Sequence, residues 1–332
     1  MRLRLLGILT LVLLLNTGYI AAFNTPSLFY MANVVLHLAL GLMLTFGAFR
    51  TVRRFPTVPL AASALIGLAI VATGNTRDFR WLLILHIAAG VAAVGALLYW
   101  SIRSRERAFQ RAVLAGSMAA LALPVGMTVA RRLAPDPRDR ITNPLLVPTS
   151  MQEEGAGPKS PFWPSSSDTN TGQTIPSNFF MDSTLCAECH KDIYDQWNSS
   201  AHHFASFNNQ FYRKSIEYMQ DVAGTQPTKW CAACHDHAVF FNGRFEKPIK
   251  DQIDTPEAQT GLGCLSCHAI SHVNGTMGNS GFIVEYPPLH ELASSRNPYI
   301  RKLDEFLTYL DPEPHRRTFL KPFMRADSAE YC

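Results

Sequence analysis

The segment Cys186-Ala-Glu-Cys189-His190-Lys-Asp-Ile-Tyr-Asp-Gln-Trp197-Asn-Ser-Ser-Ala-His202-His203 begins with two cysteines and a histidine and ends with two further histidines. The same C-x-x-C-H spacing occurs twice more, in Cys231-Ala-Ala-Cys234-His235 and Cys264-Leu-Ser-Cys267-His268, so that three copies of one motif hold six of the seven cysteines. This spacing is typical of covalent haem attachment. Two thiols on one helical turn can form thioethers with the vinyl groups of a porphyrin, and the adjacent histidine can bind its iron. The sequence therefore predicts three c-type haems, with His190, His235 and His268 as the proximal ligands.

Other uses of paired cysteines fit this pattern less well. Zinc takes four ligands, usually from two paired units, whereas each unit here carries its own histidine. A disulfide or a redox-active C-x-x-C pair would not require that histidine. Haem is the favoured cofactor, and zinc is the main alternative.

The first 132 residues are dominated by apolar runs, which lie at 5–22, 28–49, 59–74, 81–100 and 113–130. Each run approaches the ~20 residues that an α-helix needs to cross a bilayer. Because 59–74 is the shortest, we expect a bundle of four or five membrane-spanning helices. An alternative for the first run is a cleaved signal peptide, with Arg2 and Arg4 as its basic segment.

Arginines mark alternate loops between these runs. They are Arg2 and Arg4 before the first run, Arg50, Arg53 and Arg54 after the second, and Arg103, Arg105, Arg107 and Arg111 after the fourth. The positive-inside rule then places the N-terminus in the cytoplasm and the chain after residue 130 outside. We expect a protein of the bacterial inner membrane whose haem-binding part lies on the periplasmic side, where covalent haem attachment takes place.

Residues 133–180 separate the apolar region from the cysteine motifs. This segment holds eight prolines among Ser, Thr, Asn and Gly, and it shows no hydrophobic periodicity. Such a composition predicts an extended linker. The fold class expected for the chain is mainly α, with a transmembrane bundle at 1–132 and a small, loop-rich, helical multihaem domain at 181–332.

Six histidines outside the motifs are available as sixth iron ligands in the C-terminal part: His202, His203, His237, His272, His290 and His315. They are enough to give all three irons two histidine ligands. Methionine is the alternative, and it would raise the reduction potential. Met219, Met277 and Met324 are the candidates.

The motif C-x-x-C-H followed by W-x-x-S-x-H resembles the first haem site of the cytochrome c-552/c-554 group of multihaem cytochromes. Trp197, Ser200 and His202 fill this pattern. The resemblance covers residues 183–332 well and the membrane part poorly. It implies closely packed haems with mostly two histidine ligands each, His202 and His315 being distal ligands. His290, His203 and His237 are further distal candidates.

Cys332, the last residue, stands outside the three motifs. In proteins similar to this one, the stretch after His315 leads into another C-x-x-C-H motif. We therefore expect the chain to be truncated at its C-terminus, and a chain that continues past Cys332 to carry a fourth haem. The alternative is a terminal free thiol.

Two apolar runs share a histidine pattern. Val35-Leu-His37-Leu-Ala-Leu-Gly41 parallels Ile84-Leu-His86-Ile-Ala-Ala-Gly90, and both runs are expected to cross the membrane in the same direction. An ionisable side chain inside a membrane is costly and is therefore a candidate for function. His37 and His86 could bind one b-type haem, whereas the alternative is that each bonds to a neighbouring helix.

These features predict a membrane-anchored cytochrome that passes single electrons between its haems. The quinol pool is a candidate source of these electrons, and other redox proteins are the expected partners. No residues are assigned to catalysis, since each motif ends in histidine and no known catalytic pattern is present. A net charge of +4 without a basic run outside the membrane loops argues against nucleic acid as a partner. The alternatives are a fragment of a multihaem redox enzyme of nitrogen or sulfur compounds, or a haem-based membrane sensor.

Overall fold

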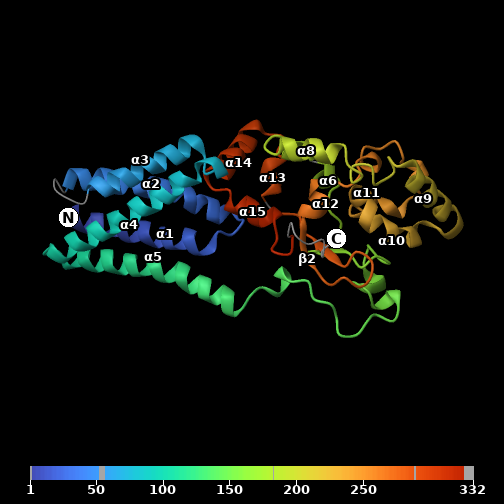
Figure 1. Ribbon diagram of the computed structural model, residues 1–332, viewed down its shortest axis with the longest axis horizontal. Helices are drawn as coiled ribbons and strands as arrows, with labels where there is room; N and C mark the ends of the chain where they lie inside the picture. Colours follow the sequence, from blue (N-terminus) through green and yellow to red (C-terminus); the bar gives the residue numbers. More distant parts are fainter. Residues whose placement is uncertain (1, 52–56, 182, 288, 325–332) are drawn as a thin grey trace. The chain divides into compact units, whose positions relative to one another are not determined.

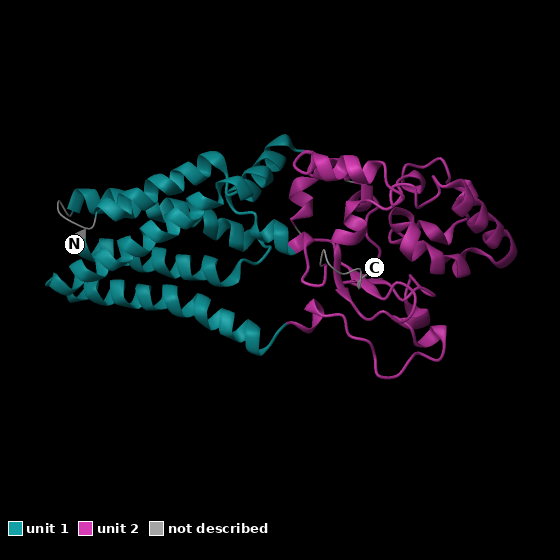
Figure 2. Ribbon diagram, viewed as in Figure 1, with its two compact units in different colours: residues 1–135, 297–317 teal, residues 136–296, 318–332 magenta. Residues whose placement is uncertain are grey.

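The computed structural model describes residues 2–51, 57–181, 183–287 and 289–324. Its packing divides the chain into two compact units, residues 1–135 with 297–317 and residues 136–296 with 318–332 (Figure 2). Helices account for most of the regular structure in both units. The mainly α fold expected from the sequence is confirmed.

The first unit is built from five long helices (Figure 1), with a short 3-10 turn at Arg77–Phe79 before the fourth. They are α1 (Arg2–Phe23), α2 (Leu28–Thr51), α3 (Thr57–Thr73), α4 (Arg80–Arg103) and α5 (Arg107–Leu133). Among the described residues, four segments are long and apolar enough to cross a membrane: Leu3–Phe23, Leu28–Thr51, Arg77–Arg103 and Arg107–Leu133. The helix α3 is shorter, at 17 residues. These spans agree with the predicted membrane anchor, and we call this part the membrane unit.

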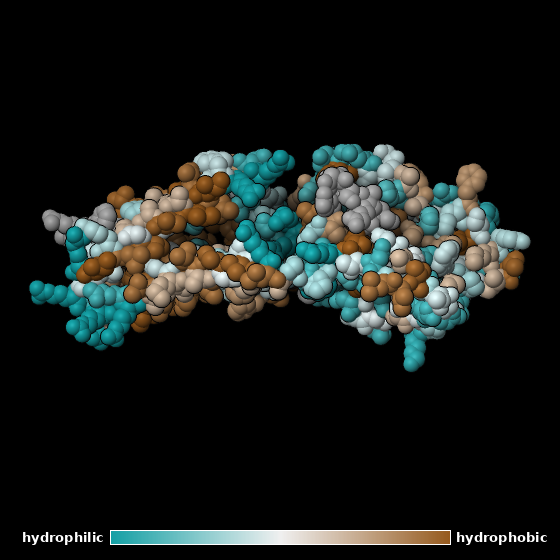
Figure 3. Space-filling view, turned by 60° about the horizontal axis from the view of Figure 1, so that its bottom comes forward, coloured by the Kyte–Doolittle hydropathy of each residue, from teal (hydrophilic) through white to brown (hydrophobic). Residues whose placement is uncertain are grey.

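Small residues bring the long helices together. A side chain at Gly7 of α1 would meet the Cα atom of Phe109 of α5 at 3.2 Å, and one at Gly116 of α5 would meet the side chain of Leu14 at 3.0 Å. Glycine at these positions lets the two backbones approach closely, as is common between membrane helices. Leucine, isoleucine and phenylalanine side chains cover much of the outer surface of the helices (Figure 3).

A segment near the C-terminus packs against one end of these helices. It contains α14 (Pro298–Leu310) and most of α15 (Glu313–Phe319). Leu307 packs with Tyr30 and Met31, and the Tyr30 hydroxyl donates a 2.7 Å hydrogen bond to Asp311. The predicted domains keep residues 181–332 together, whereas packing groups 297–317 with the membrane unit through these contacts.

The second unit consists of short helices, turns and a small sheet. Its helices are α6 (Asn178–Met181), α7 (Ser183–Ala187), α8 (Lys191–Asn198), α9 (Gln210–Ala223), α10 (Thr225–His235), α11 (His237–Phe240), α12 (Cys264–His268) and α13 (His290–Ala293). Short 3-10 turns lie at Pro137–Asp139, Met151–Glu153, Gly157–Lys159, Arg244–Glu246, Ile249–Asp251 and Glu257–Gln259. The strands β1 (Asp168–Thr169), β2 (Ile270–Val273) and β3 (Phe282–Val284) form a sheet of order β1-β3-β2. β1 is parallel to β3, and β2 is antiparallel to it with Val273 opposite Phe282.

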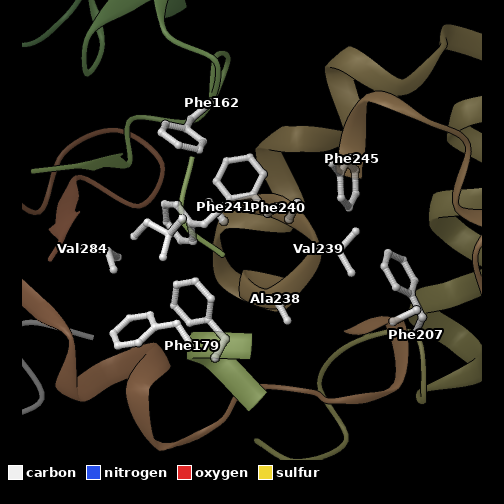
Figure 4. Close-up of a cluster of buried hydrophobic side chains, with 14 of the residues drawn as sticks. Phe162, Phe179, Phe207, Ala238, Val239, Phe240, Phe241, Phe245 and Val284 are labelled. Carbon is white, nitrogen blue, oxygen red and sulfur yellow. The ribbon is translucent and has the colours of Figure 1, made fainter. Parts of the chain in front are cut away.

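Phenylalanine rings form the core of the second unit (Figure 4). Phe162 lies 5.4 Å from Phe240 and 5.2 Å from Phe241, measured between ring centroids, and all three rings are buried. Phe179 and Phe180 are buried in the same cluster. The segment predicted to be an extended linker thus contributes to this core from Phe162 onward, because its few aromatic residues outweigh its prolines and polar residues.

Candidate functional site

Each C-x-x-C-H motif lies on a helical turn. Cys231–His235 is the last turn of α10, and Cys264–His268 is the whole of α12. In the first motif, the backbone amides of Cys189 and His190 donate to the carbonyl of Cys186 at 3.2 and 2.8 Å. The turn brings both cysteines and the following histidine of each motif to one neighbourhood, as one porphyrin requires.

In the second and third motifs, the residues between the two cysteines are buried. In α12, Leu265 and Ser266 are buried, while His268 is exposed. In α10, Ala232 and Ala233 are buried, while Cys234 is exposed. The cysteines and histidines of the motifs are partly or fully exposed.

Two motif histidines are oriented by backbone carbonyls. Nδ1 of His235 donates to the carbonyl of Ala205 at 2.6 Å, and Nδ1 of His268 donates to that of Phe319 at 2.6 Å. Because a carbonyl can only accept, Nδ1 carries the proton and the lone pair is on Nε2. Iron-binding histidines commonly have this arrangement, so these rings fit the proximal role predicted for them.

The buried carboxylate of Asp236 lies next to the second motif. Asp236 follows His235 directly, and it accepts hydrogen bonds from the hydroxyls of Ser206 and Tyr212. The Tyr212 ring also stacks on His235, with 4.4 Å between centroids. Burial raises the pKa of Asp236 to about 7. Ser206, Tyr212 and Asp236 were not predicted from the sequence, although an acidic residue directly after the motif was a visible signal.

The first and third motifs are neighbours. The Cys186 thiol hydrogen-bonds to Cys264 and lowers the pKa of the Cys264 thiol to about 6. Nε1 of Trp197 donates to the carbonyl of Leu262 at 2.7 Å, and the amide of Leu262 donates to that of His202 at 2.9 Å. The segment that follows the first motif thus contacts the loop that precedes the third.

The loop after the third motif contacts the second motif. The Ser280 hydroxyl lies 2.8 Å from the Cys234 sulfur, and Nδ2 of Asn279 donates to the carbonyl of Trp230 at 2.7 Å. All three motifs are therefore linked within one unit, as closely spaced haems require.

The candidate distal histidines lie in different surroundings. Nδ1 of His203 donates to the carbonyl of Asn198 at 2.9 Å, and the His203 ring lies 4.4 Å from that of Trp197. His203 thus has the orientation seen in His235. His272, named among the six available histidines, has it as well, since its Nδ1 donates to the carbonyl of Arg138 at 3.2 Å.

Two other histidines are buried. Nε2 of His237 donates to the carbonyl of Ala233 at 2.6 Å, so this ring has the opposite orientation. The His290 ring packs against Phe179 with 4.8 Å between centroids. His202 is exposed, and His315 lies on α15 in the part that packs with the membrane unit. Their roles as distal ligands stay predictions.

Zinc, the alternative to haem, would need several His, Cys, Asp or Glu side chains close together. Within the described ranges, no group of three or more His, Cys, Asp or Glu side chains is placed to hold a metal ion. A zinc site would need such a convergence. Attachment to a porphyrin needs only the two cysteines and the histidine of a single motif.

The two histidines of the membrane unit lie close together. The rings of His37 in α2 and His86 in α4 have centroids 6.1 Å apart. Cys332, proposed as the start of a fourth motif, lies outside the described residues, as do Arg53 and Arg54.

Residues 185–269 match the family described as cytochrome c554 and c-prime. This range contains all three motifs together with Trp197, Ser200 and His202, and it confirms the resemblance drawn from those residues. No curated protein and no solved structure matches the chain. The C-terminal half therefore contains a cytochrome c554/c-prime domain, and this family implies haem c as its cofactor.

Proposed function

We propose that this protein anchors its cytochrome c554/c-prime domain to a membrane and passes single electrons through three covalently bound haems. The observation that carries the proposal is the clustering of three C-x-x-C-H turns in one unit. In two of these turns, the histidine donates from Nδ1 to a backbone carbonyl, which leaves Nε2 for iron.

The chain would hold each haem by two cysteines and one histidine. The cysteines are Cys186 and Cys189, Cys231 and Cys234, and Cys264 and Cys267, with His190, His235 and His268 as proximal ligands. Haem supplies an iron that changes between the ferric and ferrous states. The protein keeps the histidine rings in place through contacts such as that of Tyr212 on His235.

The distal ligands would come from His202, His315, His290, His203 and His237. The orientation of His203 supports its inclusion, because its Nδ1 donates to a carbonyl. The orientation of His237 counts against it, because its Nε2 donates to Ala233.

The charges of the membrane unit support a haem domain on the outer, periplasmic face of a bacterial inner membrane. Arg4 at the start of α1 pairs with Glu106 before α5 at 3.3 Å, so these two helices begin at the same end of the unit. The end of α4 and this loop add Arg103, Arg105 and Arg107. Such a basic end favours the cytoplasmic side. The segment α14 packs at the opposite end, where α2 begins.

A membrane quinol is the class of electron donor that fits this location. Its oxidation to quinone releases two electrons and two protons, and each electron reduces one ferric haem. The acceptor would be another redox protein outside the membrane.

The test is a quantitative pyridine haemochrome spectrum of the detergent-solubilised protein. We expect three c-type haems per chain, and two after Cys264→Ala together with Cys267→Ala. The matched control Ser266→Ala changes the residue between these cysteines and should keep three. A protein without haem c would refute the proposal.

Reduction of the purified protein by a soluble quinol tests the donor. We expect the c-type absorption band of ferrous haem to appear on mixing. If quinol leaves every haem ferric while dithionite reduces them all, the donor assignment is wrong and the haem assignment stands.

A further inference from the structure

Two histidines from different helices meet in the membrane unit. His37 lies on α2 and His86 on α4, with ring centroids 6.1 Å apart and an interplanar angle of 76°. Both side chains are half-buried. They are the two histidines of the first 180 residues, and the sequence places each of them inside an apolar run.

Neighbouring groups fix the tautomer of both rings. Nδ1 of His86 donates to the carbonyl of Ser63 at 2.9 Å. Nδ1 of His37 lies 3.2 Å from Oδ1 of Asn16, whose amide nitrogen donates to Asn33 at 3.0 Å. Since Oδ1 can only accept, Nδ1 of His37 is also protonated. Each histidine therefore bonds to a neighbouring helix, as the alternative drawn from the sequence expected, but it does so through Nδ1. The lone pair of Nε2 stays available to a metal.

The ligand number selects the kind of metal site. Over the described parts of the chain, no group of three or more His, Cys, Asp or Glu side chains could hold a metal ion. Zinc and other ions bound by side chains alone usually need more than two such ligands. A haem iron brings four nitrogens of its own and needs two axial ligands from the protein.

The spacing of the rings fits axial ligation. A metal–imidazole bond of ~2 Å on each side, plus ~1 Å from nitrogen to ring centre, requires a centroid separation of ~6 Å. The observed 6.1 Å agrees with this value. The twist between the rings is not constrained, because axial ligation fixes the two nitrogens and leaves each ring free to rotate about its bond.

Glycines leave room beside both histidines. Gly41 and Gly90 each lie four residues after a histidine and so on the same face of its helix. A Cβ atom at Gly41 would meet nothing within 4 Å, and one at Gly90 would meet only the Ser63 hydroxyl, at 3.7 Å. A flat ring can approach a helix at such positions.

We propose that His37 and His86 are the axial ligands of one b-type haem held between α2 and α4. The haem is bound without thioethers, because every cysteine of the chain lies at or after residue 186. A role for this haem in passing electrons to the haem c domain rests on the proposed function, whereas its binding does not.

The site lies toward a defined end of the membrane unit. At 1.5 Å per residue, His37 is about 14 Å from the start of α2 and His86 about 9 Å from the start of α4. The segment α14 packs at this end, through Tyr30 and through a 2.7 Å hydrogen bond from the amide of Asn75 to the carbonyl of Tyr309. The haem would thus be nearer to the C-terminal segment than to the basic end.

Extraction separates the two kinds of haem. Acidified acetone removes haem b from a protein and leaves covalently bound haem c, and a haemochrome spectrum then counts each. We expect the purified full-length protein to yield one haem b per chain. His37→Ala and His86→Ala should each abolish the haem b and keep the haem c.

A glycine pair controls for misfolding. Gly41→Val should also abolish haem b, because its side chain would occupy the space of the porphyrin, whereas its Cβ atom would meet no protein atom within 4 Å. Gly95 is the matched control, since a Cβ atom there also meets nothing within 4 Å. It lies nine residues after His86 and so on the opposite face of α4, and Gly95→Val should retain both kinds of haem.

The outcomes distinguish this site from the proposed function. Haem c without extractable haem b, or haem b that persists in both histidine variants, overturns the site alone. Haem b that is lost in these variants, in a protein without haem c, upholds the site and overturns the proposed function.

Discussion

The contact between Tyr212 and Asp236 gives a quantitative test of what holds the second motif. Tyr212→Phe removes the hydroxyl that donates to the buried carboxylate. The aromatic ring that stacks on His235 remains. Asp236 then keeps the hydrogen bond from Ser206. The substitution therefore isolates one hydrogen bond without opening a large cavity.

The expected cost follows from the charge and burial of Asp236, which has 1% of its surface exposed. Because burial raises its pKa to about 7, the measurement is made at a pH well above that value, where the carboxylate is ionised. A hydrogen bond to a charged group contributes ~1.5–3 kcal/mol to the free energy of unfolding. For a unit of this size, a loss of about 2 kcal/mol lowers the unfolding midpoint by about 4–8 °C.

The assay is thermal unfolding of the haem-loaded protein in detergent, followed by circular dichroism. Tyr218→Phe is the matched control on the same helix, because Tyr218 is 72% exposed. We expect its midpoint to stay within about 2 °C of the unchanged protein, since surface substitutions usually change stability by less than ~0.5 kcal/mol.

The same Tyr212→Phe substitution in an Asp236→Asn variant tests whether the charge of Asp236 strengthens the hydrogen bond. In Asp236→Asn protein, the hydroxyl of Tyr212 would donate to a neutral oxygen, and Tyr212→Phe should then cost only ~1 kcal/mol. Equal effects in the two backgrounds would contradict a charge-assisted bond. A midpoint for Tyr212→Phe equal to that of Tyr218→Phe would refute the reasoning altogether.

Three further predictions concern other parts of the chain. Gly261→Ala should lower the thermal midpoint more than Gly172→Ala, because a Cβ atom at Gly261 would meet the carbonyl oxygen of His203 at 2.0 Å and one at Gly172 would meet nothing within 4 Å. The two glycines have similar left-handed φ values, +70° and +67°, so equal midpoints would contradict this clash. Tyr30→Phe should speed amide hydrogen exchange in α14, because it removes the 2.7 Å hydrogen bond to Asp311. Tyr299→Phe, at an 82% exposed position of α14, should not, and similar exchange in both variants would contradict a role of this bond in holding α14. Carbon monoxide should bind the reduced protein slowly or not at all if each iron has two histidine ligands, and fast binding in a flash-photolysis experiment would favour a haem enzyme or sensor instead.

The fold class and the haem-binding motifs were predicted from patterns within short stretches of the sequence. The spacing of Cys264, Cys267 and His268 is a property of one helical turn, and the apolar runs are properties of single helices. The matched family confirms a cytochrome domain, and four of the described helical segments are long and apolar enough to cross a membrane. Such features can be predicted because the chemistry of thioether formation and of membrane insertion acts on neighbouring residues.

Long-range packing decided the rest. Composition could not show that Phe162 enters the aromatic core or that residues 297–317 pack with the membrane unit. Nor could it show that the Tyr212 hydroxyl donates a hydrogen bond to Asp236. The parallel patterns around His37 and His86 marked two candidate ligands, but only the tertiary structure set their rings 6.1 Å apart. The reason is physical: each of these contacts joins residues far apart in the chain, and its geometry depends on how every intervening element packs.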